Sequence, residues 1–233
     1  MKSICFIGAR GGSKGVPKKN IRMISDKPLI AHTIESAIDS KLFSHVVVST
    51  ENQEIMKVAK EYGAEVPFIR PKKFSTDSSG FGDVIAHGIK KLFSLGYNFE
   101  TIVNRDCTVP FIRNKDIKGT IELIEKTKCD CVVGIYRQHL NPYFNIMEKN
   151  SKGFLKICKT LKKRPKSRQT SPIVYQLNGL FTYNANRFLK HKTPLPPKTL
   201  PYEIPQESGF MIDTELEFKM AEFLMKQKIF KNK

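Results

Sequence analysis

The chain has 233 residues, of which 40% are hydrophobic, and its formal net charge at pH 7 is +18. This length suits a single large α/β domain, and the hydrophobic fraction is high enough for a buried core. No segment approaches the roughly 18 consecutive apolar residues of a membrane-spanning helix, and the first apolar run is too short for a signal peptide. We therefore expect a soluble cytoplasmic protein that is not bound to a membrane.

The positive charge is compatible with nucleic-acid binding, and the densest basic cluster lies at residues 162–168. The lysines are nevertheless spread over the whole chain, and no DNA- or RNA-binding motif is present. Nucleotides and acidic sugars would be attracted by the same potential. Nucleic acid is therefore the less favoured partner, and a non-catalytic basic RNA-binding protein stays open as an alternative.

The five cysteines do not have the spacing of a metal site, because Cys129 and Cys131 have no second pair nearby. Cys5 and Cys131 fall in apolar runs, where a free cysteine packs as a small hydrophobic residue. This usage favours a reducing compartment.

Runs of apolar residues predict alternating strands and helices in chain order. The expected strands are residues 4–7, 45–50, 66–69, 101–110 with a terminal turn, 130–136 and 174–183; the expected helices are residues 28–40, 52–62, 82–95 and 116–126. This alternation is typical of a mainly parallel sheet between two layers of helices. Ligands then bind at the carboxyl ends of the strands.

The alternation is interrupted between residues 137 and 172. Two short apolar runs, at residues 143–146 and 154–157, flank Asn150 and Gly153 and predict a hairpin. Four prolines between residues 194 and 201 predict an exposed loop.

A glycine-rich basic loop follows the first strand directly. Its glycines allow the backbone to fold closely around an anion, and Arg10, Lys14 and Lys19 add positive charge. The loop matches neither the Walker pattern nor the dinucleotide fingerprint. A solvated basic turn is the alternative, but the position after a buried strand favours a polyphosphate site.

Three other segments carry candidate site residues. Asp106 comes at the end of a strand, where it can bind metal or substrate, or cap the next helix. Ser78 and Ser79 can cap a helix or read a base edge. Asp213, Thr214 and Glu215 predict the start of a last helix, where acidic residues are also favoured electrostatically.

Residues 9–20 resemble the signature A-R-x-x-S-K-[GR]-[IVL]-P-x-K-N of the cytidylyltransferases that activate sialic acids and related nonulosonic acids. Further segments resemble motifs of this family in the same order: residues 70–79, the D-x-D-x-T-x-P variant at 104–110, R-Q-x-x-P at 168–172, N-G at 178–179 and D-I-D-T-E at 211–215. The resemblance extends from residue 4 to about residue 224.

The resemblance implies a three-layer, Rossmann-like nucleotidyltransferase fold of one domain over residues 1–233. Residues 137–172 would be an inserted dimerisation extension that reaches the active site of a partner subunit, so a homodimer is expected. The implied reaction joins CTP and a nine-carbon nonulosonic acid to give a CMP-sugar and pyrophosphate. An eight-carbon or other keto-deoxy sugar acid is the alternative substrate.

The resemblance also assigns roles to individual residues. Arg10, Lys14, Lys19 and Asp213 would be catalytic, and Asp106 and Asp213 would hold a divalent metal, Mg²⁺. The substrate-binding residues would be Ala9, Gly11, Ser13, Asn20, Ser78, Ser79, Asp106, Thr108, Arg168, Gln169, Gln176, Asn178 and Gly179.

Three positions depart from the family pattern. Asn104 stands for the first aspartate of its motif, and Met211 replaces the first aspartate near the last helix. Gln176 occupies a position where sialic acid enzymes often carry arginine, which favours an acid of the legionaminic type.

Overall fold

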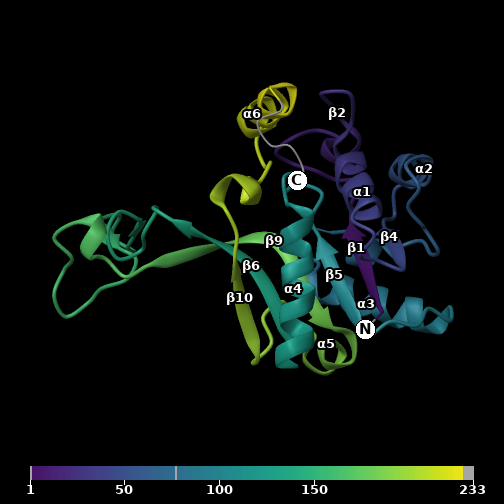
Figure 1. The fold of residues 1–233 in the computed structure, drawn as a ribbon. Helices are drawn as coiled ribbons and strands as arrows, with labels where there is room; N and C mark the ends of the chain where they lie inside the picture. The colour runs from purple at the N-terminus through teal and green to yellow at the C-terminus, as the bar shows by residue number, and fades with distance from the viewer. Residues whose placement is uncertain (1, 77, 228–233) are drawn as a thin grey trace.

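A six-stranded sheet forms the centre of the computed structural model, which describes residues 2–76 and 78–227 (Figure 1). The strands lie in the order β10-β6-β9-β5-β1-β4. Their bounds are β1 Ser3–Gly8, β4 His45–Ser49, β5 Thr101–Arg105, β6 Cys131–Gln138, β9 Val174–Asn184 and β10 Thr199–Glu203. Strand β9 is antiparallel to β5 and β6, and the other neighbouring pairs are parallel. The prediction of a mainly parallel sheet is confirmed.

Helices cover both faces of this sheet. The main helices are α1 Leu29–Asp39, α2 Gln53–Glu61, α3 Phe81–Ser94, α4 Asn114–Thr127, α5 Ala185–His191 and α6 Glu215–Lys226. In β1, Ile4 and Phe6 pack against α3 and α5, whereas Cys5 and Ile7 pack against α1 and α2. A strand that is apolar on both faces is typical of the buried centre of a parallel sheet. The three expected layers are therefore present.

None of the helices in the described ranges is long and apolar enough to cross a bilayer.

Local signals explain where several elements begin and end. The Asn52 side chain accepts a hydrogen bond from the Ile55 amide and caps α2, and Gly63 follows that helix with a φ of 87°. Helix α6 begins with a reciprocal capping box between Thr214 and Glu217. This cap holds the chain that precedes α6, which contains Asp213.

Two sequence predictions are wrong. Residues 66–69 do not form a strand, because the chain makes only an isolated bridge between Val47 and Glu65 before Pro67, which has no amide hydrogen to donate. The proline-rich stretch is not entirely loop, since Pro201 lies within β10. Strand β10 is at the edge of the sheet, where a missing donor is tolerated. Helix α5 was also not expected.

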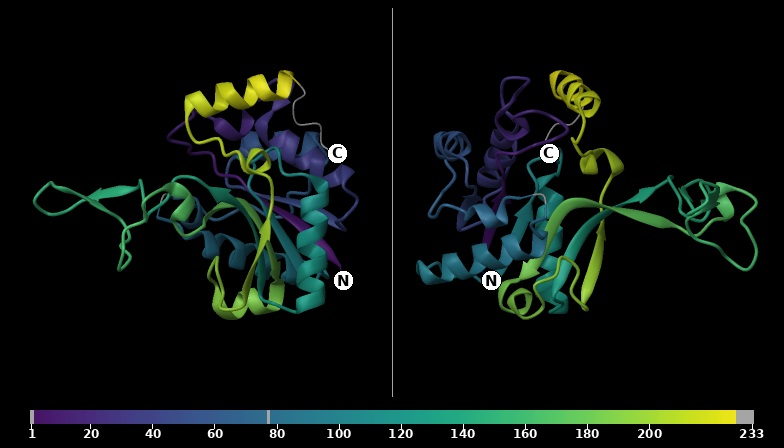
Figure 2. Two further views of the ribbon diagram at one scale, coloured as in Figure 1. Left: turned by 60° about the vertical axis from the view of Figure 1, so that its left-hand side comes forward. Right: turned by 180° about the vertical axis from the view of Figure 1, so that it is seen from behind.

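Residues 139–173 form an arm that extends away from the body in both views (Figure 2). Strands β7 Met147–Lys149 and β8 Leu155–Ile157 pair antiparallel within it, so the predicted hairpin is confirmed. Its first strand lies later than expected, because the backbone carbonyl of Asn141 accepts the amides of residues 144–146 in a turn.

The short helices are η1 Lys19–Ile21, η2 Lys72–Phe74, η3 Arg168–Thr170 in the arm and η4 Gln206–Gly209. Strands β2 Met23–Ile24 and β3 Lys27–Pro28 form a small hairpin.

Candidate active site

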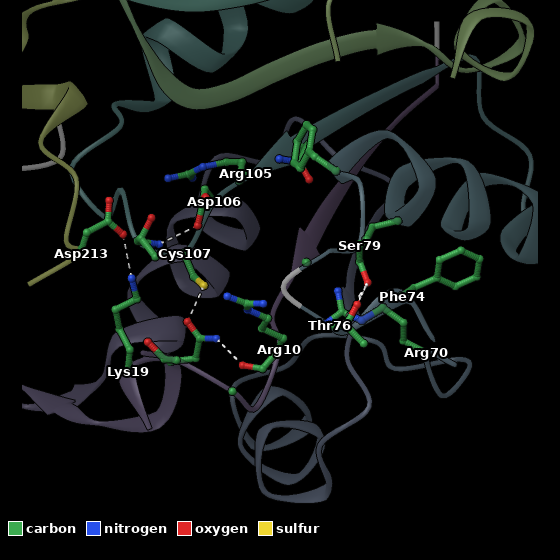
Figure 3. A pocket seen from close by; sticks show the side chains of 18 of the residues that line it. Arg10, Lys19, Arg70, Phe74, Thr76, Ser79, Arg105, Asp106, Cys107 and Asp213 are labelled. Carbon is green, nitrogen blue, oxygen red and sulfur yellow. Dashed lines mark hydrogen bonds and ion pairs between the residues drawn. The ribbon is translucent and has the colours of Figure 1, made fainter. Parts of the chain in front are cut away.

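A cavity of about 380 Å³ opens where β1 and β5 end. Four segments line it: the glycine-rich loop, residues 70–84, residues 104–108 and the chain before α6. In Figure 3, Asp213 and Lys19 lie on one side and Ser79 and Thr76 on the other, with Arg10 between them. The predicted site residues in the lining are Arg10, Ser13, Lys19, Asn20, Ser79, Asp106, Thr108 and Asp213. The sequence motifs therefore meet at the carboxyl edge of the sheet, as expected.

Lys19 is the most enclosed cation of the basic loop that faces this cavity. Its side chain is 11% exposed, and its Nζ donates to the Ile212 carbonyl at 2.6 Å and to Asp213 Oδ1 at 3.0 Å. These contacts join the loop to the chain before α6. Lys19 therefore holds two site segments together while presenting positive charge to the cavity.

Gly15 allows the same two segments to approach one another. A Cβ atom at position 15 would lie 1.9 Å from the carbonyl oxygen of Asp213, a distance that real atoms do not reach. Only glycine fits between the loop and this backbone. The loop glycine has a steric role as well as the flexibility that the sequence suggested.

The turn after β5 is fixed by hydrogen bonds on both sides. The Asp106 amide donates to the Gly179 carbonyl, and Asp106 Oδ1 accepts the Thr108 amide at 3.0 Å. Cys107 Sγ donates to Asn20 Oδ1 at 3.0 Å, and Asn20 Nδ2 donates to the Arg10 carbonyl. Burial raises the pKa of the Cys107 thiol, as does the nearby Asp106 charge, so this cysteine serves as a neutral hydrogen-bond donor.

Ser78 and Ser79 do not cap α3, so the capping alternative is wrong. Gly80, which has no side chain, occupies the N-cap position, so neither serine caps the helix. The Ser79 hydroxyl instead accepts the Thr76 amide at 3.0 Å and donates to the Lys73 carbonyl at 2.9 Å. Ser79 lines the cavity, whereas Ser78 is not part of its lining.

Two residues that the sequence did not single out also shape the site. Arg70 lines the cavity with a side chain that is 4% exposed, and its Nη2 donates to Glu51 Oε2 at 2.9 Å. Glu51 Oε1 accepts the Gly11 amide at 2.7 Å. Burial alone would raise the pKa of Glu51, but the hydrogen bonds from Gly11, Arg70 and Ser75 lower it below its ordinary value. An isolated glutamate after a strand carries no motif by which the sequence could have revealed it.

The other expected site residues lie outside the cavity lining. Ala9 is buried, Gly11 directs its amide to Glu51, and Lys14 is exposed on the loop. Asn178 is buried. Gly179 has a φ of 78° and lies against Asp106: a Cβ on Gly179 would be 2.8 Å from the Asp106 Cβ. The three remaining residues belong to the arm and its base: Arg168 and Gln169 are exposed, and Gln176 accepts a hydrogen bond from Gln138.

The cavity lining has a donor set that suits Mg²⁺ accompanied by a nucleotide. Within residues 2–76 and 78–227, no group of three or more His, Cys, Asp or Glu side chains forms a metal centre. Asp106 and Asp213 do line the same cavity, and Mg²⁺ on a triphosphate takes only one or two carboxylates, with phosphate and water oxygens completing its shell. Met211 also lines the cavity, but its thioether is a poor ligand for a hard cation.

Comparison with known proteins defines the family. A model of the cytidylyltransferase family matches residues 4–228. The chain belongs to the cytidylyltransferase family. It is therefore a nucleotidyltransferase, and the resemblance found in the sequence is confirmed.

Two relatives and one solved structure show how far the similarity extends. Post-translational flagellin modification protein B of Campylobacter coli is 34% identical over 229 residues, 97% of this chain and 95% of the relative. CMP-N,N'-diacetyllegionaminic acid synthase of Campylobacter jejuni subsp. jejuni serotype O:2 is 33% identical over 227 residues, with the same coverage of both chains. The structure of CMP:2-keto-3-deoxy-manno-octonic acid synthetase complexed with CTP has a TM-score of 0.73 at 16% identity, covering 98% of this chain and 100% of that one. That likeness shows a shared fold.

Proposed function

We propose that this cytidylyltransferase transfers CMP from CTP to a nonulosonic acid and releases pyrophosphate. The observation that carries the proposal is the meeting of the signature loop, through Arg10 and Lys19, with Asp106 and Asp213 around one cavity. The similarity to a CMP-N,N'-diacetyllegionaminic acid synthase over 97% of the chain supports a nonulosonic acid as acceptor. Residue Gln176 supports an acid of the legionaminic type over sialic acid.

The chemistry is a displacement at phosphorus. The anomeric hydroxyl of the acid attacks the α-phosphorus of CTP in line and gives up its proton to solvent. A new oxygen–phosphorus bond forms, and the bond to pyrophosphate breaks. Two anions must approach each other, so positive charge on the triphosphate lowers the barrier most. Arg10, Lys14 and Lys19 supply this charge. Asp106 and Asp213 would hold Mg²⁺, which neutralises further phosphate charge when bound.

The remaining assignments concern the nucleotide base and the sugar. Ser79 reads the cytosine edge, with Ser78 beside it, while Ser13, Asn20, Thr108 and the backbone of Ala9 and Gly11 hold the nucleotide. Asn178 and Gly179 support the sugar side beneath Asp106.

The arm is proposed to join two copies of this chain. It exposes large apolar side chains, among them Phe154 at 68% and Leu155 at 61%. A two-stranded hairpin is only marginally stable by itself and needs a surface to cover it. A second copy would supply that surface, and Arg168 and Gln169 would then reach the partner's cavity.

All five cysteines are free, which supports a reducing, cytoplasmic location.

The function is tested by measuring pyrophosphate release from CTP with a panel of purified acids: N,N'-diacetyllegionaminic acid, sialic acid and an eight-carbon keto-deoxy acid. We expect turnover with the legionaminic acid and none with UTP in place of CTP. Turnover only with the eight-carbon acid would replace the proposed acceptor. Binding to RNA that falls steeply with salt, without CTP turnover, would overturn the enzyme proposal.

A further inference from the structure

A half-buried carboxylate connects the glycine-rich loop to the opposite wall of the cavity. Glu51 follows β4 at the carboxyl edge of the sheet, and its side chain is 17% exposed. Oε1 accepts the Gly11 amide at 2.7 Å, and Oε2 accepts from Arg70 Nη2 at 2.9 Å. One side chain therefore contacts two segments that are 59 residues apart in sequence (70 − 11 = 59).

Arg70 is placed by more than this one contact. Its Nε donates to Ser75 Oγ at 3.0 Å, and its Nη1 faces Gly8, the last residue of β1. The guanidinium thus lies between the loop and residues 70–84, both of which line the cavity. A change in its position would alter the width of the cavity.

The charge of Glu51 needs an explanation, because a carboxylate beside a triphosphate loop repels the ligand. Here hydrogen bonds from Gly11 and Arg70 are directed at the two oxygens, so the negative charge is compensated locally. Gly11 gives its amide to Glu51, whereas the next residues, Gly12 and Ser13, line the cavity. The carboxylate therefore decides which part of the loop faces the ligand.

We propose that Glu51 is a positioning residue for CTP: it fixes the glycine-rich loop and Arg70 at one separation before the nucleotide binds. This inference rests on the proposed function, since it takes CTP as the ligand of the cavity. Glu51 does not contact the reacting atoms; it acts through Gly11 and Arg70. A preorganised site gains affinity because the ligand does not have to order it.

The test compares Glu51→Gln with Glu54→Gln as a matched control. Glu54 lies in the first turn of α2 and pairs with Lys18 of the same loop at 3.0 Å, but both side chains are more than half exposed. Glu51→Gln keeps the shape but can accept only one of the two hydrogen bonds. We expect it to raise the dissociation constant for CTP about tenfold, because a charge-assisted hydrogen bond is lost. Glu54→Gln should leave the constant unchanged.

Calorimetric titration with CTP, without the sugar acid, measures the dissociation constant. A separate thermal scan measures the unfolding midpoint of each variant. The KM for CTP should rise in Glu51→Gln while the KM for the sugar acid stays constant. Adding Arg70→Gln to Glu51→Gln should cost less than the product of the separate effects, because the two residues act as a unit. Glu51→Asp, which keeps the charge but is too short to reach both donors, should also weaken CTP binding and serves if Glu51→Gln does not fold.

The outcomes separate the two claims. If wild-type protein does not bind CTP, the proposed function fails and this inference fails with it. If wild-type protein binds CTP and Glu51→Gln binds equally well, only the inference is overturned, even when the unfolding midpoint falls. Fully multiplicative effects of Glu51→Gln and Arg70→Gln would also overturn it.

Discussion

Lys19 and Asp213, 194 residues apart in the chain, form an ion pair with Nζ 3.0 Å from Oδ1. The same Nζ donates to the carbonyl of Ile212 at 2.6 Å. The first signature loop and the last motif are therefore joined at one atom. Lys19 has a structural contact in addition to the triphosphate role that we propose for it.

Replacing Lys19 by alanine should lower both turnover and stability. The substitution removes a cation from the cavity and leaves the Ile212 carbonyl without this donor, which costs about 1–3 kcal/mol of unfolding free energy. We expect kcat to fall at least about a hundredfold, as for loss of one preorganised donor to developing charge. Turnover at saturating CTP and urea unfolding measure the two effects. Lys18→Ala, which removes a 70% exposed neighbour, should change neither, and near-normal turnover of Lys19→Ala would contradict its role.

Gly15→Ala should separate the loop from the chain before α6. The new Cβ would meet the Asp213 carbonyl at 1.9 Å, so one backbone must move, and overpacking of this kind costs about 1–3 kcal/mol. The ion pair between Lys19 and Asp213 would be disturbed with it. We expect loss of CTP binding measured by calorimetry. Unchanged CTP affinity of Gly15→Ala would show that the close approach of the two segments does not matter.

Ser79→Ala should reduce the preference for CTP over UTP more than Ser78→Ala does. Ser79 lines the cavity, and Ser78 is outside its lining. The Ser79 hydroxyl also bonds Thr76 and Lys73 within its own loop, so its removal shifts the loop that faces the base. The measurement is the ratio of kcat/KM for the two nucleotides. An unchanged ratio in Ser79→Ala would leave this hydroxyl with the loop contacts alone.

Phe154→Glu should convert a dimer into monomers. Phe154 is 68% exposed on the arm, and a charge there would be buried in the interface that we propose. Sedimentation velocity at micromolar concentration measures the change. Leu95→Glu, at an exposed position at the end of α3, should leave the assembly intact. A wild-type protein that is fully active as a monomer would overturn the dimer proposal.

The sequence was most informative where one periodic pattern or one long motif decided the structure. Ile4 and Phe6 alternate with Cys5 and Ile7 in a strand that is buried on both faces, so its place in the sheet could be predicted. Strand β10 could not, because Pro201 is disfavoured in strands unless the edge of the sheet accommodates it, and the edge is a property of the whole topology.

The sequence also could not indicate the partners of single polar residues. Glu51 and Arg70 are 19 residues apart, with α2 between them, and they form a pair only because the fold brings the end of β4 next to Arg70. Arg105 is fully buried at the end of β5, with Nη1 donating to Ser36 Oγ, and its Nε and Nη2 have no hydrogen-bond partner among the described residues. An arginine is almost never buried unless it is paired, so no pattern in the sequence indicates this position.

Asp213→Asn should be close to inactive, because Met211 cannot replace the lost carboxylate. Both side chains line the cavity, but a thioether does not serve a hard cation. The neutral amide would also end the ion pair with Lys19 Nζ. Met211→Asp restores the first aspartate of the family motif and adds a carboxylate beside Asp213. It should therefore lower the Mg²⁺ concentration needed for half-maximal turnover or leave it unchanged, and it should not abolish activity. Turnover against Mg²⁺ concentration for wild type and the two variants is the measurement. Normal activity of Asp213→Asn at low Mg²⁺ would reduce Asp213 to a partner of Lys19 and leave Asp106 as the one metal ligand of this proposal.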